Sequence, residues 1–117
     1  MNPEAMRLNR FQYVIAYLRN HLRYAKLLRI DHVMGLHRLY WIPAELTGDK
    51  GVYVKYPAEE LWAILSLESH LHSAGIIGEN LGTVPPEVNQ EMAKHDIRQM
   101  YVLQYEIMGI LRAPSRQ

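Results

Sequence analysis

The sequence predicts an α/β protein built on a short parallel sheet. Two short apolar runs, residues 27–31 and 76–79, have the composition of buried strands, and they end in Asp31 and Glu79. Segments with helical periodicity precede the first run and separate it from the second. Alternating helices and strands are typical of a parallel sheet that is covered by its connecting helices.

A first helix is expected from Asn2 to about residue 24. Asn2 suits the N-cap, Pro3 suits the first helical position, and Glu4 places a negative charge in the first turn. Apolar residues then recur every three or four positions and give one apolar face: Leu8, Phe11, Ile15, Leu18, Leu22 and Ala25. The helix should end before residue 27, because the strand that follows has no helical face.

Residues 33–54 are expected to form a long loop after the first strand. Glycines and a proline interrupt this segment, and it sustains no period beyond a short helical turn near residues 36–39. Long loops in small domains are commonly functional or disordered, but the aromatic residues here argue against disorder.

Two more helices and a third strand complete the expected elements. Pro57 with two following acids opens a helix that ends near Gly75, and a proline pair at residues 85–86 opens another that ends near His95. Residues 100–105 resemble a third strand, and residues 109–117 a ragged C-terminal end. Three strands cannot close a barrel, so residues 1–108 are expected to be the central segment of a larger unit, with exposed edges that favour self-association.

The composition sets limits on function. The 117 residues are 49% hydrophobic and 21% charged, which suits one small globular domain. A net charge of +1 gives no general attraction to nucleic acid or anionic membranes, and no apolar stretch approaches the roughly 20 residues of a membrane helix. The absence of Cys excludes disulfides, and the six His residues form no convergent ligand set. We therefore expect a cytoplasmic protein without a metal, an organic cofactor, a nucleic-acid partner or a membrane anchor.

Asp31 and Glu79 are the candidate catalytic residues. Adjacent parallel strands lie about 4.8 Å apart, so acids at their carboxyl ends can approach to about 5–5.5 Å, the separation found in retaining glycosidases. Arg29 lies two residues before Asp31 on the same strand face, where its charge favours an ionised nucleophile. Glu79 would then be the acid/base. The residues alone leave a structural alternative open, in which Asp31 caps a turn and Arg29 is its salt-bridge partner.

Four segments of the chain resemble the 4-α-glucanotransferases (amylomaltases, or disproportionating enzymes) of the α-amylase clan. They are residues 28–36 (LRIDHVMGL), 38–43 (RLYWIP), 51–61 (GVYVKYPAEEL) and 76–85 (IIGENLGTVP). These motifs are long and ordered, and the resemblance extends from Asn2 to about residue 107.

This resemblance implies a partial (β/α)8, or TIM, barrel that runs from helix 3 to strand 6 of the family fold. It makes Asp31 the nucleophile and Glu79 the acid/base, and it adds Arg29, His32 and Asn80 as substrate-binding residues. Asn80 stands where the family more often has Asp. The implied substrate is an α-1,4-glucan or malto-oligosaccharide, and no cofactor is implied. Two alternatives remain: a non-catalytic segment that only self-associates or binds glucan, and an α-glucan hydrolase of the same clan.

Overall fold

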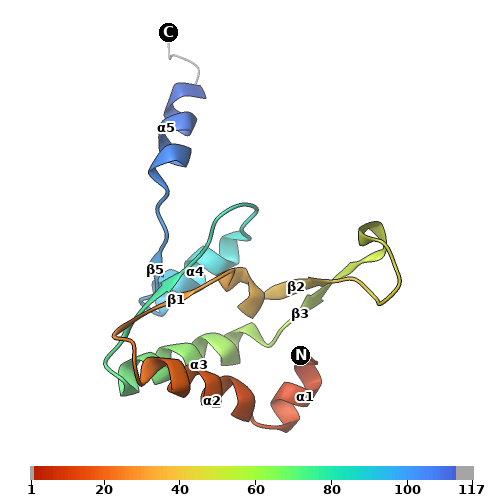
Figure 1. Cartoon of the computed structure of the whole chain (residues 1–117), viewed down its shortest axis with the longest axis vertical. Helices are drawn as coiled ribbons and strands as arrows, with labels where there is room; N and C mark the ends of the chain where they lie inside the picture. Colours follow the sequence, from red (N-terminus) through yellow and green to blue (C-terminus); the bar gives the residue numbers. More distant parts are fainter. Residues whose placement is uncertain (1, 113–117) are drawn as a thin grey trace.

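Three parallel strands form the central sheet, as the sequence predicts (Figure 1). The computed structural model describes residues 2–112. Its elements are α1 (Pro3–Leu8), α2 (Gln12–Leu22), β1 (Leu27–Ile30), η1 (Val33–Leu36), β2 (Arg38–Trp41), η2 (Gly48–Lys50), β3 (Val52–Lys55), α3 (Ala58–Leu71), β4 (Gly75–Gly78), α4 (Pro86–Lys94), β5 (Arg98–Gln99) and α5 (Leu103–Arg112).

The strand order is β1-β4-β5, so the two strands that precede the candidate acids are direct neighbours. Their parallel register pairs Leu27 with Gly75 and Ile30 with Gly78. On the other side of β4, Ile77 pairs with Arg98 of β5. The predicted adjacency of the acid-bearing strands is therefore confirmed.

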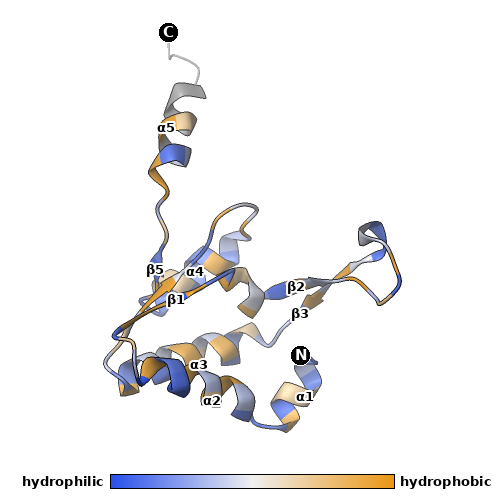
Figure 2. Ribbon diagram, viewed as in Figure 1, coloured by the Kyte–Doolittle hydropathy of each residue, from blue (hydrophilic) through white to orange (hydrophobic). Residues whose placement is uncertain are grey.

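The hydrophobic core lies between the sheet and the helices. Helices α2 and α3 pack against each other, and α4 packs beside β5. Figure 2 shows hydrophobic residues along β1 and on α2 and α3, with hydrophilic residues between them. The largest buried side chains are Trp62, Leu18, Leu22 and Met92. None of the helices described combines the length and hydrophobicity needed to traverse a bilayer.

The prediction of one long N-terminal helix is wrong. The helix breaks between Leu8 and Gln12, where Arg10 and Phe11 have φ angles of 48° and 54°. The break changes which residues face the core: Met6 and Val14 are buried, whereas Leu8 is 87% exposed. No Gly marks this left-handed turn in the sequence, and the apolar period continues through it.

The expected loop at residues 33–54 contains a β-hairpin that the sequence reading missed. Strands β2 and β3 pair antiparallel, with Tyr40 opposite Tyr53. Their rings meet edge to face at 5.0 Å between centroids, and the Arg38 guanidinium lies 4.3 Å from the Tyr53 ring centroid. The predicted helical turn is present but earlier, as η1. Figure 1 shows the hairpin projecting away from the three-stranded sheet.

The prediction of a strand at residues 100–105 is also wrong. The third strand is the short β5, which ends at Gln99, and α5 begins at Leu103. The next backbone N–H after β5, that of Met100, donates to the side-chain Oδ1 of Asn80 (3.1 Å). Helix α5 continues to Arg112, and residues 113–117 of the expected ragged end lie outside the described residues.

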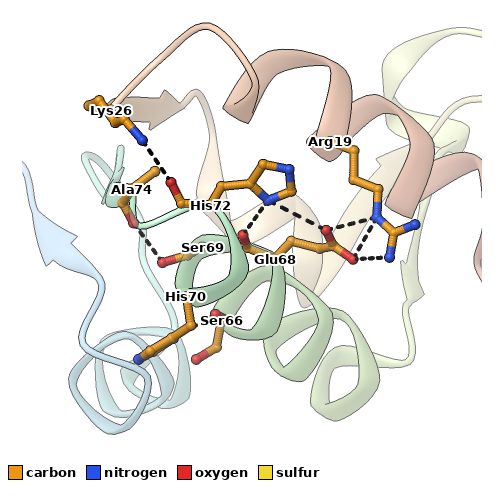
Figure 3. Close-up of polar contacts among 8 residues, drawn as sticks. All are labelled: Arg19, Lys26, Ser66, Glu68, Ser69, His70, His72 and Ala74. Atoms are coloured by element: carbon orange, nitrogen blue, oxygen red, sulfur yellow. Dashed lines mark hydrogen bonds and ion pairs between the residues drawn. The ribbon is translucent and has the colours of Figure 1, made fainter.

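A buried carboxylate joins α2 to α3 (Figure 3). Glu68 is only 2% exposed, and Arg19 donates to both of its oxygens over 2.9–3.0 Å. These hydrogen bonds raise the pKa of Arg19 above its ordinary value. The His72 Nδ1 lies 3.8 Å from Glu68 Oε2. The charge of Glu68 is thus compensated at the helix–helix contact.

We expect Arg19→Met to lower the thermal unfolding midpoint of the chain, because it leaves the Glu68 carboxylate buried without its main partner. The double variant Arg19→Met/Glu68→Leu should recover the midpoint, since it removes the buried charge as well. Arg23→Met, at the exposed end of α2, is the matched control and should change little. A double variant that melts at or below the single variant would contradict this account.

Candidate active site

Asp31 and Glu79 leave the sheet at the same edge. Each directly follows its strand, and the preceding residues, Ile30 and Gly78, are register partners. The Glu79 N–H donates to the Ile30 carbonyl oxygen over 2.8 Å, which continues the ladder one residue beyond the strands. The structure therefore places the two predicted acids on neighbouring strand ends, at corresponding positions.

Arg29 is bound to Asp31, as the sequence predicts. The Arg29 Nη2 lies 2.6 Å from Asp31 Oδ1, and the Asp31 side chain is 77% exposed. The Arg29 Nε also donates to the sulfur of Met100 over 3.1 Å. The ion pair fits an oriented nucleophile, and it equally fits the structural alternative in which Arg29 only balances the charge of Asp31.

The Glu79 carboxylate is held by two backbone N–H groups. His32 N–H donates to Oε2 and Leu81 N–H donates to Oε1, each over 2.8 Å. The Glu79 backbone carbonyl accepts from the Val33 N–H over 2.9 Å. Both oxygens of the candidate acid/base therefore have a fixed orientation relative to the turn that carries Asp31.

His32 occupies a left-handed turn directly after Asp31. Its φ angle of 46° is uncommon for a residue with a side chain, and it starts the 3-10 helix η1. His32 and Asp31 line an open pocket of about 300 Å³, together with Tyr17, Leu36 and Tyr56. The His32 side chain is thus beside the candidate nucleophile, where a ligand in the pocket can reach it.

Asn80 uses both ends of its amide within the chain. Its Nδ2 donates to Asn89 Oδ1 (2.8 Å) and to Gln99 Oε1 (3.1 Å), while its Oδ1 accepts from the Met100 N–H. It therefore connects the end of β4 to α4 and β5. The sequence reading did not include Asn89 and Gln99, because no motif places these two amides beside Asn80.

We expect Asn80→Leu to destabilise the chain by about 1–3 kcal/mol, because it leaves two partly buried polar groups, Asn89 Oδ1 and the Met100 N–H, without their partner. Asn80→Asp should cost less than about 1 kcal/mol, since the amides of Asn89 and Gln99 can each turn by 180° and donate to a carboxylate. Urea denaturation compares the two variants. An equal loss in both would contradict the hydrogen-bonding role of residue 80.

No metal centre is present among the residues that the structure describes. Within residues 2–112, no three side chains of His, Cys, Asp or Glu gather in a way that could hold an ion. The polar groups that contact the two acids are the Arg29 guanidinium at Asp31 and the backbone N–H groups of His32 and Leu81 at Glu79.

The sequence matches a protein family over almost its whole length. The family model is described as 4-alpha-glucanotransferase, and it matches residues 1–114. The 4-alpha-glucanotransferase of Haemophilus influenzae is 45% identical over 104 residues, which are 89% of this chain and 15% of that protein. The chain thus spans about 15% of the length of this relative.

Solved structures of amylomaltases share the fold. The amylomaltase of Corynebacterium glutamicum superposes with a TM-score of 0.86 at 32% identity, covering 97% of this chain and 16% of that one. An amylomaltase of Streptococcus agalactiae, solved in complex with acarbose, gives a TM-score of 0.77 at 23% identity, covering 89% and 21%. The second likeness concerns the fold alone. With its family match over residues 1–114, its parallel α/β sheet and its acids at adjacent strand ends, the chain belongs to the 4-alpha-glucanotransferase family.

Proposed function

We propose that this chain carries the nucleophile and the acid/base of an enzyme that transfers α-1,4-glucan segments between malto-oligosaccharides with retention of configuration. The observation that carries the proposal is the pairing of β1 with β4, which brings Asp31 and Glu79 to corresponding positions at one edge of the sheet. The family match supports the same reaction class.

The proposed reaction has two displacements. An Asp31 carboxylate oxygen attacks the anomeric carbon, the glycosidic C–O bond breaks, and the leaving oxygen takes the proton of Glu79. In the second step the 4-hydroxyl of an acceptor attacks the same carbon and releases Asp31, while Glu79 takes the hydroxyl proton. Two displacements at one carbon restore its configuration.

Arg29 and His32 are proposed to act on the sugar that Asp31 attacks. The contact of 2.6 Å from Arg29 to Asp31 orients the carboxylate and stabilises its charge. The His32 imidazole lines the same pocket as Asp31, where its ring nitrogens can hydrogen-bond a sugar hydroxyl. Transfer rather than hydrolysis then depends on the acceptor excluding water from the intermediate.

We further propose that the segment corresponds to helix 3 through strand 6 of a (β/α)8 barrel, with β1, β4 and β5 as strands four, five and six. The parallel order β1-β4-β5 supports this placement, because consecutive strands of such a barrel are neighbours. In that setting the acids would lie at the carboxyl ends of the strands, where the reactive residues of these barrels are found.

A second candidate function is a segment that binds glucan or self-associates without catalysis. The 77% exposure of Asp31 favours it for the isolated chain, because the nucleophile is then surrounded by water and not by a closed site. Among residues 2–112, no further strand pairs with the outer edges of β1 and β5, and these edges would provide the surface for self-association.

A chimera separates these functions. The 104 aligned residues of this chain replace the matching segment of the Haemophilus influenzae relative. Incubated with maltotriose, the chimera should yield glucose together with longer oligosaccharides, and the isolated chain should yield neither. Production of shorter sugars only would indicate a hydrolase, and a folded but inactive chimera would contradict the proposed function.

A further inference from the structure

We propose that Glu79 also positions Asp31, so that one side chain supplies the acid/base and holds the nucleophile in place. This inference rests on the proposed function. Its basis is the set of hydrogen bonds that connects Glu79 to the residues on both sides of Asp31, which we call the Glu79 clamp.

The Glu79 clamp consists of three contacts. The Glu79 N–H donates to the Ile30 carbonyl oxygen over 2.8 Å, before Asp31 in the chain. After Asp31, the His32 N–H donates to Glu79 Oε2 over 2.8 Å and the Val33 N–H donates to the Glu79 carbonyl oxygen over 2.9 Å. Asp31 itself therefore lies between residues that are each bound to Glu79.

Only one of these contacts depends on the Glu79 side chain. The two backbone contacts continue the pairing of β1 with β4 and would be retained by any residue other than proline at position 79. The bond from the His32 N–H is different: it is formed in a turn with φ of 46°, which brings successive N–H groups of His32 and Val33 toward Glu79. The carboxylate thus stabilises an uncommon backbone conformation immediately after the nucleophile.

The clamp leaves Glu79 able to react. A carboxylate offers about four lone-pair sites on its two oxygens. His32 and Leu81 occupy one site on each oxygen. The remaining sites can carry the proton that the leaving group receives, so the two roles of Glu79 are compatible.

Asn80, the residue after Glu79, holds the backbone at this end of β4 in place. Asn80 binds Asn89 of α4, Gln99 of β5 and the Met100 N–H, which anchors the residue after Glu79 to two other elements. The Glu79 carboxylate therefore extends from an anchored backbone toward the exposed turn that carries Asp31. We infer that Glu79 positions this turn, and not the reverse.

The variant Glu79→Gln tests the clamp, because glutamine has the shape of the glutamate side chain but cannot accept hydrogen bonds at both of its terminal atoms. Both oxygens of Glu79 accept from backbone N–H groups, so a glutamine must turn its NH₂ toward either His32 or Leu81. One donor then faces another donor, and one contact is lost. The Leu81 contact joins residues only two positions apart, so we expect the glutamine oxygen to keep it and the His32 contact to be the one lost. The variant thus loosens the turn in addition to removing the titratable proton.

Amide hydrogen exchange on the whole chain tests the contact directly. In Glu79→Gln we expect the amide of His32 to exchange about 10-fold faster or more. The Gly75 amide, which binds the Lys26 carbonyl oxygen at the other end of β4, should not change and reports that the fold persists. Glu87→Gln, an exposed acid in the first turn of α4, is the matched control. Unchanged exchange at His32 would overturn the clamp, whatever the rate at Leu81.

An activated donor tests the consequence for Asp31 in the chimera. α-Maltotriosyl fluoride needs no acid, because Asp31 forms a bond to the anomeric carbon while the C–F bond breaks and fluoride leaves as an anion. If Glu79 were the acid/base alone, Glu79→Gln would still form the covalent adduct rapidly and accumulate it. With the clamp, adduct formation should slow by about 100-fold, the effect of misplacing a reacting group by about 1 Å.

The outcomes distinguish the clamp from the proposed function. Slow adduct formation by Glu79→Gln, beside rapid formation by the unsubstituted chimera, supports the clamp. A burst of fluoride at the unsubstituted rate overturns the clamp and leaves the proposed function intact. If the unsubstituted chimera releases no fluoride, the proposed function is contradicted, and the exchange rate of the His32 amide decides the clamp on its own.

Discussion

Asp31→Asn in the chimera should lower glucan transfer by about 10⁴-fold or more and should prevent formation of the covalent adduct. The amide keeps the shape of the side chain but has no anionic oxygen to attack the anomeric carbon, and a removed nucleophile is among the most severe losses an enzyme shows. The substitution also removes the negative charge that Arg29 contacts over 2.6 Å. The rate of glucose release from maltotriose measures the loss.

The control for this prediction is Asp96→Asn. Asp96 is exposed, lies between α4 and β5, and precedes its strand, so it is at the opposite edge of the sheet from Asp31. Its φ of 54° is one that asparagine adopts readily. Transfer by Asp96→Asn should equal that of the unsubstituted chimera. Retention of more than about a tenth of the activity in Asp31→Asn would exclude Asp31 as the nucleophile.

Trp62→Ala should destabilise the chain by about 3–5 kcal/mol, a large part of the 5–15 kcal/mol that a domain commonly has. Trp62 is 1% exposed in α3 and stacks on His95 at the end of α4, with ring centroids 6.5 Å apart and planes inclined by 12°. Its removal should leave a cavity where the indole now packs on the His95 ring. Urea denaturation followed by circular dichroism measures the change.

Trp41→Ala provides the same substitution at the surface. Trp41 is 39% exposed on the β2–β3 hairpin, away from the core. Its replacement should change the free energy of unfolding by about 0.5–1 kcal/mol at most. If Trp62→Ala and Trp41→Ala unfolded at the same urea concentration, the buried Trp62 side chain would contribute no more to stability than the exposed Trp41, which would contradict this prediction.

The sequence predicts the parts of the fold whose signals are local. The strands before Asp31 and Glu79 are short apolar runs with clear limits, and α4 begins at a proline pair, so these elements lie close to where the sequence places them. The hairpin was missed because β2 and β3 are separated by residues 42–51, which contain Gly and Pro and carry no short turn signature.

The errors arise where an uncommon backbone conformation or a contact between distant residues decides the path of the chain. The break after Leu8 depends on left-handed conformations at Arg10 and Phe11, which no glycine announces. The early end of β5 coincides with the bond from the Met100 N–H to Asn80, twenty positions earlier in the chain. The hydrogen bond from the His32 N–H to Glu79 likewise needs a positive φ at His32. The two acidic residues could therefore be predicted from the sequence, but the hydrogen bond that connects Glu79 to the turn after Asp31 could not.

The most direct test of the central claim is to identify the carboxylate that becomes glycosylated. The chimera is treated with 5-fluoro-α-glucosyl fluoride, which traps the glycosyl-enzyme intermediate. The protein is then digested with a protease, and the labelled peptide is identified by tandem mass spectrometry. A label on Asp31, formed about 100-fold more slowly in Glu79→Gln, is the predicted result. A label on any other carboxylate, with Asp31 unmodified, would contradict the account.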